Sequence, residues 1–132
     1  MTPPSKDLFS APDGKVLETL TDSRTMAVAA GVTVGAAAEK ALWRSGRAQF
    51  GVSAMSASGE VVYYAPKADG TADTTQPHPQ FRTNRNVARA AGVVACVAGI
   101  EFSNNKEAQY GFLGAGAIFL AHIVQDVVPF LR

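Results

Sequence analysis

The chain has 132 residues, enough for one domain of ordinary size. Charged residues make up 17% of it, against roughly 25% in an average soluble domain, and the net charge is only +1. This balance gives no field that would attract nucleic acid, and the 47% of hydrophobic residues argues against general disorder. The one cysteine, Cys96, excludes an internal disulfide, and its small apolar neighbours predict a buried thiol without catalytic bases nearby.

Residues 1–24 are expected to form a polar, turn-rich N-terminal segment. Its beginning lacks the basic and apolar regions of a signal peptide. Lys15 to Leu20 could make one or two helical turns. The triplet Thr21, Asp22 and Ser23 then predicts a cap for the helix that follows.

Residues 25–43 form the first apolar segment, and their alanine content favours a helix. Gly31 and Gly35 are four residues apart and share a face, which is a spacing that lets two helices approach closely. Trp43, Arg44 and Arg47 predict an interfacial anchor with a basic flank. The uncharged stretch is shorter than the ~20 residues of a clean membrane span, so a buried Ala-rich helix is the equal alternative.

Residues 44–82 are predicted to be a β-hairpin followed by a Pro-rich arm. Ser58 and Gly59 separate two β-prone runs, which is typical of a hairpin turn. Pro66, Gly70 and Pro77 then interrupt regular structure, so an extended, exposed arm is expected as far as residue 82.

Residues 83–132 predict a C-terminal helical hairpin. Thr83 or Asn84 can cap the first helix, a polar turn lies at residues 103–107, and Pro129 should end the second helix. Arg85 and Arg89 open the first helix and are predicted to be further interfacial anchors. Small residues at helical spacing are predicted to mediate close packing in this half: Ala91, Ala95, Gly99, Gly111, Gly114 and Ala115.

The predicted fold is therefore mainly α with a small β-hairpin, and two to three of its small-residue-rich apolar helices are expected to be transmembrane. Weakly amphipathic helices need cover on all sides, and a chain of this length has little with which to provide it. The basic flanks of the first two segments would also meet on one side of a membrane. Against this interpretation, Arg89, Glu101 and Asp126 lie near the helix ends.

No catalytic residue set and no metal-ligand cluster stands out in the sequence. His122 is the first candidate for binding a cofactor, since a histidine inside a membrane can bind a metal, a haem or a pigment, whereas His78 between two prolines is expected in an exposed loop. Asp126 follows it by four residues on the same face, so a hydrogen bond between the two, or a contact with a partner, is the interpretation that we favour.

The predicted function is that of a small, non-catalytic accessory subunit of a multi-subunit membrane complex. The expected setting is a bioenergetic membrane (mitochondrial inner, thylakoid or bacterial inner membrane) with a respiratory, ATP-synthase or photosynthetic complex. The expected partners are other subunits of the complex and lipid, with bound lipid or pigment as the cofactor class and no nucleic acid. The alternatives are a soluble α+β ligand-binding domain or small enzyme, and a homo-oligomeric shell component.

Overall fold

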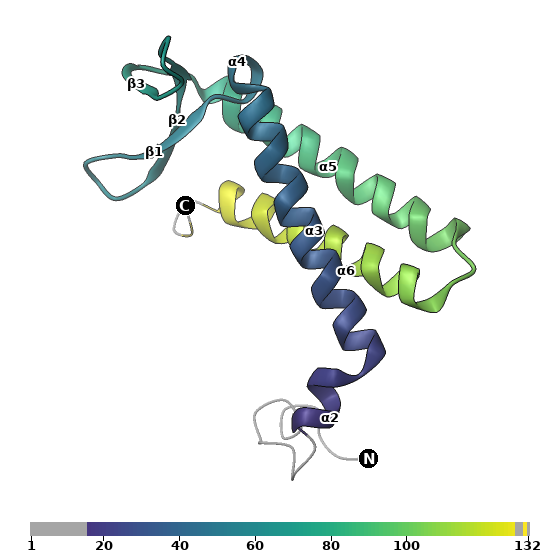
Figure 1. Ribbon diagram of the computed structural model, residues 1–132. Coiled ribbons are helices and arrows are strands. Elements are labelled where there is room, and N and C mark those ends of the chain that lie inside the picture. The colour runs from purple at the N-terminus through teal and green to yellow at the C-terminus, as the bar shows by residue number, and fades with distance from the viewer. Residues whose placement is uncertain (1–15, 129–130, 132) are drawn as a thin grey trace.

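The structure is a computed structural model in which residues 16–128 and residue 131 are described. Three long helices dominate it: α3 (Ser23–Ser45), α5 (Pro79–Phe102) and α6 (Lys106–Val127). A short α2 (Val16–Thr21) precedes α3, and a single turn, α4 (Arg47–Phe50), leads into a three-stranded sheet. Figure 1 shows the sheet at the end of the bundle where α3 finishes and α5 begins. Residues 1–15 of the predicted N-terminal segment, and Pro129, lie outside the described residues.

Helix α3 begins where the predicted cap lies. The Asp22 carboxylate accepts a hydrogen bond from the backbone N–H of Arg24 at 2.8 Å, so it satisfies one of the unpaired donors of the first turn. At the other end the N–H of Gly46 bonds to the carbonyl of Leu42 before α4 starts. The α2–α3 junction therefore follows local capping chemistry that the sequence displays.

Helix α6 lies between α3 and α5 and packs against both (Figure 1). Its crossing with α3 depends on glycines, because a Cβ atom on Gly31 would overlap the carbonyl oxygen of Gly111, and one on Gly114 would overlap that of Val28. A Cβ on Gly35 would meet Ile118 at 2.8 Å and Ala115 at 3.2 Å. The predicted small-residue positions on these two helices thus pack against each other within the chain.

Helices α5 and α6 form an antiparallel pair across a short turn at residues 103–105 (Figure 1). Gly92 faces the ring of Phe119, and Gly99 faces the ring of Phe112. Ala91 and Ala95, predicted to mediate packing, are exposed instead, so the contact face runs through Gly92, Cys96 and Gly99. Gly99 therefore lies on the contact face as predicted, whereas at the other two positions the contact falls on the residue that follows.

The predicted cap of α5 at Thr83 or Asn84 is wrong. The helix starts earlier in the chain, at Pro79, with His78 as its N-cap residue. Proline suits the first helical position, since its missing N–H would have no intrahelical partner there. Helix α6 has a side-chain cap, in which Asn105 Oδ1 accepts from the N–H groups of Glu107 and Ala108.

The sheet has strands β1 (Val52–Met55), β2 (Val61–Pro66) and β3 (Ala72–Pro77), all antiparallel in the order β1-β2-β3. The predicted hairpin is β1–β2, with Gly59 at φ +84° in its turn. The predicted Pro-rich arm is partly wrong, because β3 pairs with β2 through an irregular register from Tyr64↔Pro77 to Pro66↔Ala72. Proline is tolerated there because β3 is an edge strand.

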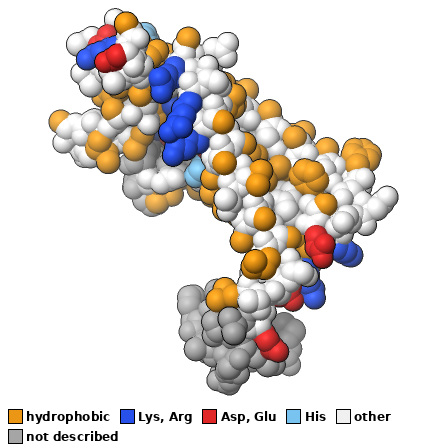
Figure 2. Space-filling model, in the orientation of Figure 1, with side chains coloured by type: hydrophobic (Ala, Val, Ile, Leu, Met, Phe, Trp, Pro, Cys, Tyr) orange, Lys and Arg blue, Asp and Glu red, His pale blue; other side chains and the backbone are white. Residues whose placement is uncertain are grey.

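Burial in this bundle is reversed from that of an ordinary soluble core. Among the described residues, the buried hydrophobic side chains are Tyr63, Tyr64 and Cys96, and no large aliphatic side chain is among them. The buried charged ones are Glu39, Arg85, Arg89 and Asp126. Figure 2 shows hydrophobic side chains spread over the outer surface of the helices. The core at the sheet end is therefore ionic, and many large apolar side chains of the helices are exposed, although Ile118 and Phe119 pack against glycines of the neighbouring helices.

The expectation of two to three spanning helices is corrected by the structure. Among the described residues, only α6 is long and apolar enough to cross a membrane, and this is weak evidence because the core helix of a soluble protein passes the same test. Helix α5 carries Arg82, Arg85 and Arg89 in its first half, and α3 is diluted by alanine and glycine and carries Glu39 and Lys40. These charged and small residues make α3 and α5 too polar to be candidate membrane spans.

Candidate functional site: a buried cluster of charges

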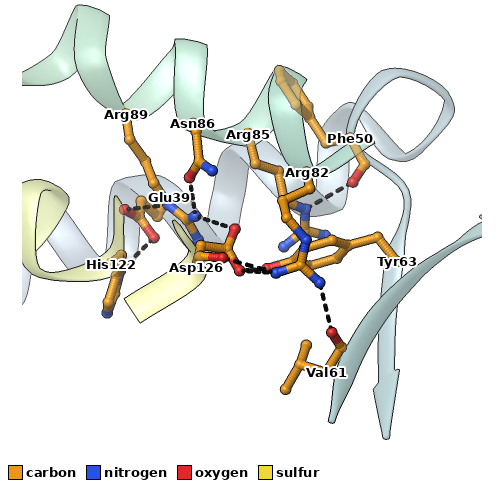
Figure 3. A network of polar contacts seen from close by, with 10 residues as sticks. All are labelled: Glu39, Phe50, Val61, Tyr63, Arg82, Arg85, Asn86, Arg89, His122 and Asp126. Atoms are coloured by element: carbon orange, nitrogen blue, oxygen red, sulfur yellow. Dashed lines mark hydrogen bonds and ion pairs between the residues drawn. The ribbon is translucent and has the colours of Figure 1, made fainter. Parts of the chain in front are cut away.

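Four elements meet in a cluster of charged side chains at the sheet end of the bundle (Figure 3). Helix α5 supplies Arg82, Arg85 and Arg89, which share a face because they are three and four residues apart. The other members are Glu39 from α3, His122 and Asp126 from α6, and Tyr63 from β2.

Arg89 lies at the centre of the cluster and links two carboxylates. Its Nη1 donates to Asp126 Oδ2 at 3.0 Å and to Asn86 Oδ1 at 2.9 Å, and its Nε donates to Glu39 Oε1 at 3.3 Å. The side chains of Arg89, Glu39 and Asp126 are each 7% exposed. Removing these three charges from water is costly, and their pairing with one another offsets that cost.

Asp126 is the most heavily bonded acceptor. Its Oδ2 accepts from Arg89, and its Oδ1 accepts from Arg82 Nη1 at 2.7 Å and from the Tyr63 hydroxyl at 3.0 Å. Arg82 also donates through Nη2 to the carbonyl of Val61 at 2.7 Å. One carboxylate thus ties the end of α6 to the start of α5 and to strand β2.

Glu39 is paired with His122 as well as with Arg89. Its Oε2 lies 2.8 Å from His122 Nδ1, which joins α3 to α6 across 83 residues of sequence. His122 and Asp126 share a helix face, as their spacing predicts. They do not bond to each other, because His122 pairs with Glu39 and Asp126 pairs with Arg82 and Arg89. No hydrogen bond to His122 Nε2 occurs among the described residues.

Arg85 is held differently from the other two arginines. It is 5% exposed, its Nε donates to the carbonyl of Phe50 at 2.7 Å, and its Nη2 donates to that of Gly51 at 2.9 Å. Its guanidinium carbon lies 4.7 Å from the ring centre of Trp43 and 4.3 Å from that of Tyr63. Cation–π contacts and backbone oxygens thus replace the carboxylate that a buried arginine usually has.

The environment of Tyr63 keeps its hydroxyl protonated. Burial raises its pKa above the ordinary value, and the nearby charge of Asp126 and the hydrogen bond to it raise the pKa further. Arg85 and Arg89 act in the opposite direction with smaller effect. The hydroxyl is therefore a fixed donor to Asp126 at neutral pH.

A hollow of about 220 Å³ opens beside the cluster. Its lining includes Glu39, Tyr63, Arg89, His122, Gln125 and Asp126. The carboxylate oxygens of Glu39 and Asp126 are paired with Arg82, Arg89, the Tyr63 hydroxyl and His122, whereas His122 Nε2, on a residue that also lines the hollow, makes no hydrogen bond with the described residues. Among residues 16–128 and 131, no group of three His, Cys, Asp or Glu side chains could hold a metal ion.

The predicted anchor residues separate into two sets in the structure. Arg85 and Arg89 point into the bundle and are buried. Arg44 and Arg47 are exposed, and Trp43 is half-buried, at the C-terminal end of α3. The basic flanks of the first two apolar segments do lie at the same end of the bundle, since Arg44, Arg47 and Arg85 line one hollow.

Sequence reasoning missed Glu39, Tyr63 and Arg82 as members of the cluster. Two signals were available. Glu39 continues the Gly31–Gly35 stripe by another four residues, so it had to lie on the packed face of α3. The three arginines of α5 follow a helical spacing that no surface pattern requires. Tyr63 gave no such signal, because the partner of its hydroxyl lies 63 residues away.

Comparison of the chain with models of protein families, with curated proteins and with solved structures found no match.

Proposed function

We propose that the protein is a small, non-catalytic subunit of a membrane complex, with α6 in contact with the lipid bilayer and with helices of neighbouring subunits. The charged cluster would fix the helices and the sheet relative to one another at one membrane face. The role proposed is structural, namely to present an apolar helix surface to its surroundings.

The exposure of α6 carries this proposal. It is the most apolar of the described helices, yet only 11% of its most apolar stretch is buried by the rest of the protein. The core helix of a soluble protein would be mostly covered. Large apolar side chains lie open along α6: Phe112, Leu113, Leu120, Val124 and Val127. A surface of this kind is typical of a helix that lipid or another protein covers.

The dimensions of α6 are consistent with this setting. Its 22 residues give a length of about 33 Å, close to the ~30 Å of a bilayer's hydrocarbon core. Ionisable residues near a membrane are tolerated where they face the bundle interior and pair with one another, which is what Glu39, Arg89 and Asp126 do.

The non-catalytic part of the proposal depends on the saturation of the cluster. Arg82 and Arg89 neutralise the two carboxylates, and the resulting bonds join α3, α5, α6 and β2. A catalytic site needs a base or nucleophile that can reach its substrate. In this cluster both carboxylates serve as structural acceptors, and Glu39 holds the ring of His122, whose Nε2 is the remaining candidate base.

Fractionation of the full chain tests the proposal. The protein is expressed with a terminal tag, and membranes are washed with sodium carbonate at pH 11 and then extracted with dodecyl maltoside. We expect it to stay in the carbonate-washed membranes and to be released by detergent. Recovery from the detergent-free supernatant as a monodisperse monomer would contradict the proposal and favour the soluble binding domain or small enzyme.

A further inference from the structure

A second hollow, of about 210 Å³, lies at the C-terminal end of α3 and differs in charge from the one beside the cluster. Its charged lining residues are all cations: Lys40, Arg44 and Arg47 from α3 and α4, and Arg85 from α5. Trp43 and Ser53 complete its polar lining. Figure 2 shows Lys and Arg side chains gathered near the sheet end of the molecule.

These cations form no ion pairs within the described part of the protein, although Asp126 and Glu39 act on Arg85 at longer range. In the part of the chain that the structure describes, no carboxylate lies within ion-pair distance of Lys40, Arg44, Arg47 or Arg85. Arg85 is nine-tenths buried, and its Nη1 has no hydrogen-bond acceptor among the described residues, since only Nε and Nη2 are used. The hollow therefore combines a buried guanidinium with an unused donor and an excess of positive charge.

The spacing of these residues works against the helix that carries them. Lys40 and Arg44 are four residues apart, so their like charges lie side by side on α3 and weaken the helix. Both are exposed and make no hydrogen bond or ion pair with the described residues. Because folding gains nothing from their proximity, an external anion is the better explanation for it.

An apolar groove adjoins the basic hollow and shares Trp43 with it. The groove holds about 150 Å³ between α3 and α5, and its apolar lining comprises Ala38, Leu42, Ala88, Gly92 and Phe119, with the mutually paired Glu39 and Arg89 also lining it. A ligand with a phosphate at one end and a hydrocarbon chain at the other would fill both spaces. Guanidinium groups bind phosphate oxygens in pairs, and basic pockets between helices at a membrane face bind anionic headgroups.

We infer that this hollow binds the phosphate of an anionic phospholipid headgroup, with an acyl chain in the groove between α3 and α5. The inference rests on the proposed function, since it needs the sheet end of the bundle at a membrane face. It goes beyond membrane embedding, because it names the class of lipid bound and the residues that contact it.

Trp43 is the only tryptophan of the chain, so its fluorescence reports on the hollow directly. The full-length protein in dodecyl maltoside is titrated with phosphatidylglycerol, with phosphatidylcholine and with inorganic phosphate. We expect a saturable change with phosphatidylglycerol and a much weaker one with phosphatidylcholine. Lys40→Gln combined with Arg44→Gln should raise the Kd for phosphatidylglycerol about 30-fold, the factor expected for two basic residues at a lipid surface.

The matched control removes two cations far from the hollow, Arg24→Gln with Lys106→Gln, and should change the Kd less than twofold. Without lipid, the Lys40/Arg44 variant should melt at the same temperature as the wild type or higher, because a like-charge pair is gone. Equal loss of affinity in both double variants would overturn the inference, as would equal binding of both lipids. If inorganic phosphate saturates the site and phosphatidylglycerol does not displace it, the ligand is a soluble phosphate and the lipid assignment is overturned.

The fractionation experiment separates the two proposals. If the wild type stays in carbonate-washed membranes but does not discriminate between the lipids, the headgroup site is wrong and the membrane role stands. If the wild type is soluble, both fail.

Discussion

At the scale of single residues, Asp126 shows how much of the fold depends on one carboxylate. It accepts hydrogen bonds from Arg82 and Arg89 on α5 and from Tyr63 on β2, so it joins the end of α6 to a helix and a strand at once. Pairing of this kind is weak evidence for net stabilisation, but losing one partner leaves the others buried without compensation. Tyr63 is the partner whose contribution can be isolated, because it is uncharged.

Replacing Tyr63 with Phe removes the hydrogen bond to Asp126 and leaves the ring in place. We expect the free energy of unfolding to fall by about 1.5 kcal/mol, the lower end for a hydrogen bond to a charged group, since two arginines still hold Asp126. Thermal unfolding in detergent measures this loss. Tyr64→Phe is the matched control, because Tyr64 is also buried and its hydroxyl makes no hydrogen bond with the described residues.

The raised pKa of Tyr63 gives the same variant a signature in its pH dependence. The folded protein favours the protonated hydroxyl, so its stabilising contribution is complete below the pKa of an unfolded tyrosine, about 10. It is lost as the pH rises through the higher folded value. The wild type should therefore lose more stability than Tyr63→Phe as the pH rises above about 10. Parallel losses in the two proteins would show that folding does not raise the pKa of Tyr63.

At the scale of elements, the crossing of α3 and α6 depends on where the glycines face. A Cβ on Gly114 would overlap the carbonyl of Val28, and backbone cannot yield as a flexible side chain can. A Cβ on Gly111 would meet only the carbonyl of Ala27, at an ordinary 3.8 Å. Two glycines three residues apart on one helix therefore have opposite steric requirements.

Alanine at these two positions should have effects of opposite sign. Gly114→Ala is expected to cost about 2 kcal/mol of stability through overpacking. Gly111→Ala should gain up to about 1 kcal/mol, because alanine favours the helix and meets no obstacle. Unfolding midpoints of the two variants in the same detergent give the comparison. Equal effects would mean that the helices do not cross at Gly114.

The elements that the sequence predicts well are those with local causes. Helix α3 follows from its alanines and the Asp22 cap, and the β1–β2 hairpin from the Ser58–Gly59 turn. Strand β3 was missed because two prolines bound a polar run, and only its pairing with β2 makes it a strand. The packing stripe on α5 was displaced because Ala91, Ala95 and Gly92 are all small, so composition does not decide which of them faces α6.

At the scale of the whole molecule, the charged cluster could not be predicted from spacing alone. Its longest links join Glu39 to His122 and Tyr63 to Asp126, across 83 and 63 residues of sequence. Such pairs exist only once the α3–α6 crossing and the docking of the sheet are fixed. The same arrangement fills the interior at the sheet end with charges and leaves many large apolar side chains of the helices exposed.

A lysine on the open face of α6 tests what covers that face. Leu113 is 50% exposed in the middle of the apolar stretch, so a soluble protein should accept Leu113→Lys with a change in stability within about 0.5 kcal/mol. In a membrane the same lysine costs about 2.5–3.5 kcal/mol at the centre of a span. The amount of the variant in the carbonate-resistant fraction should therefore fall at least about tenfold. Met55→Lys is the matched control, because Met55 is 69% exposed on strand β1, outside the helices. If both variants fractionate like the wild type, lipid does not cover α6. Loss from the membrane fraction with Leu113→Lys alone would locate the bilayer contact on α6.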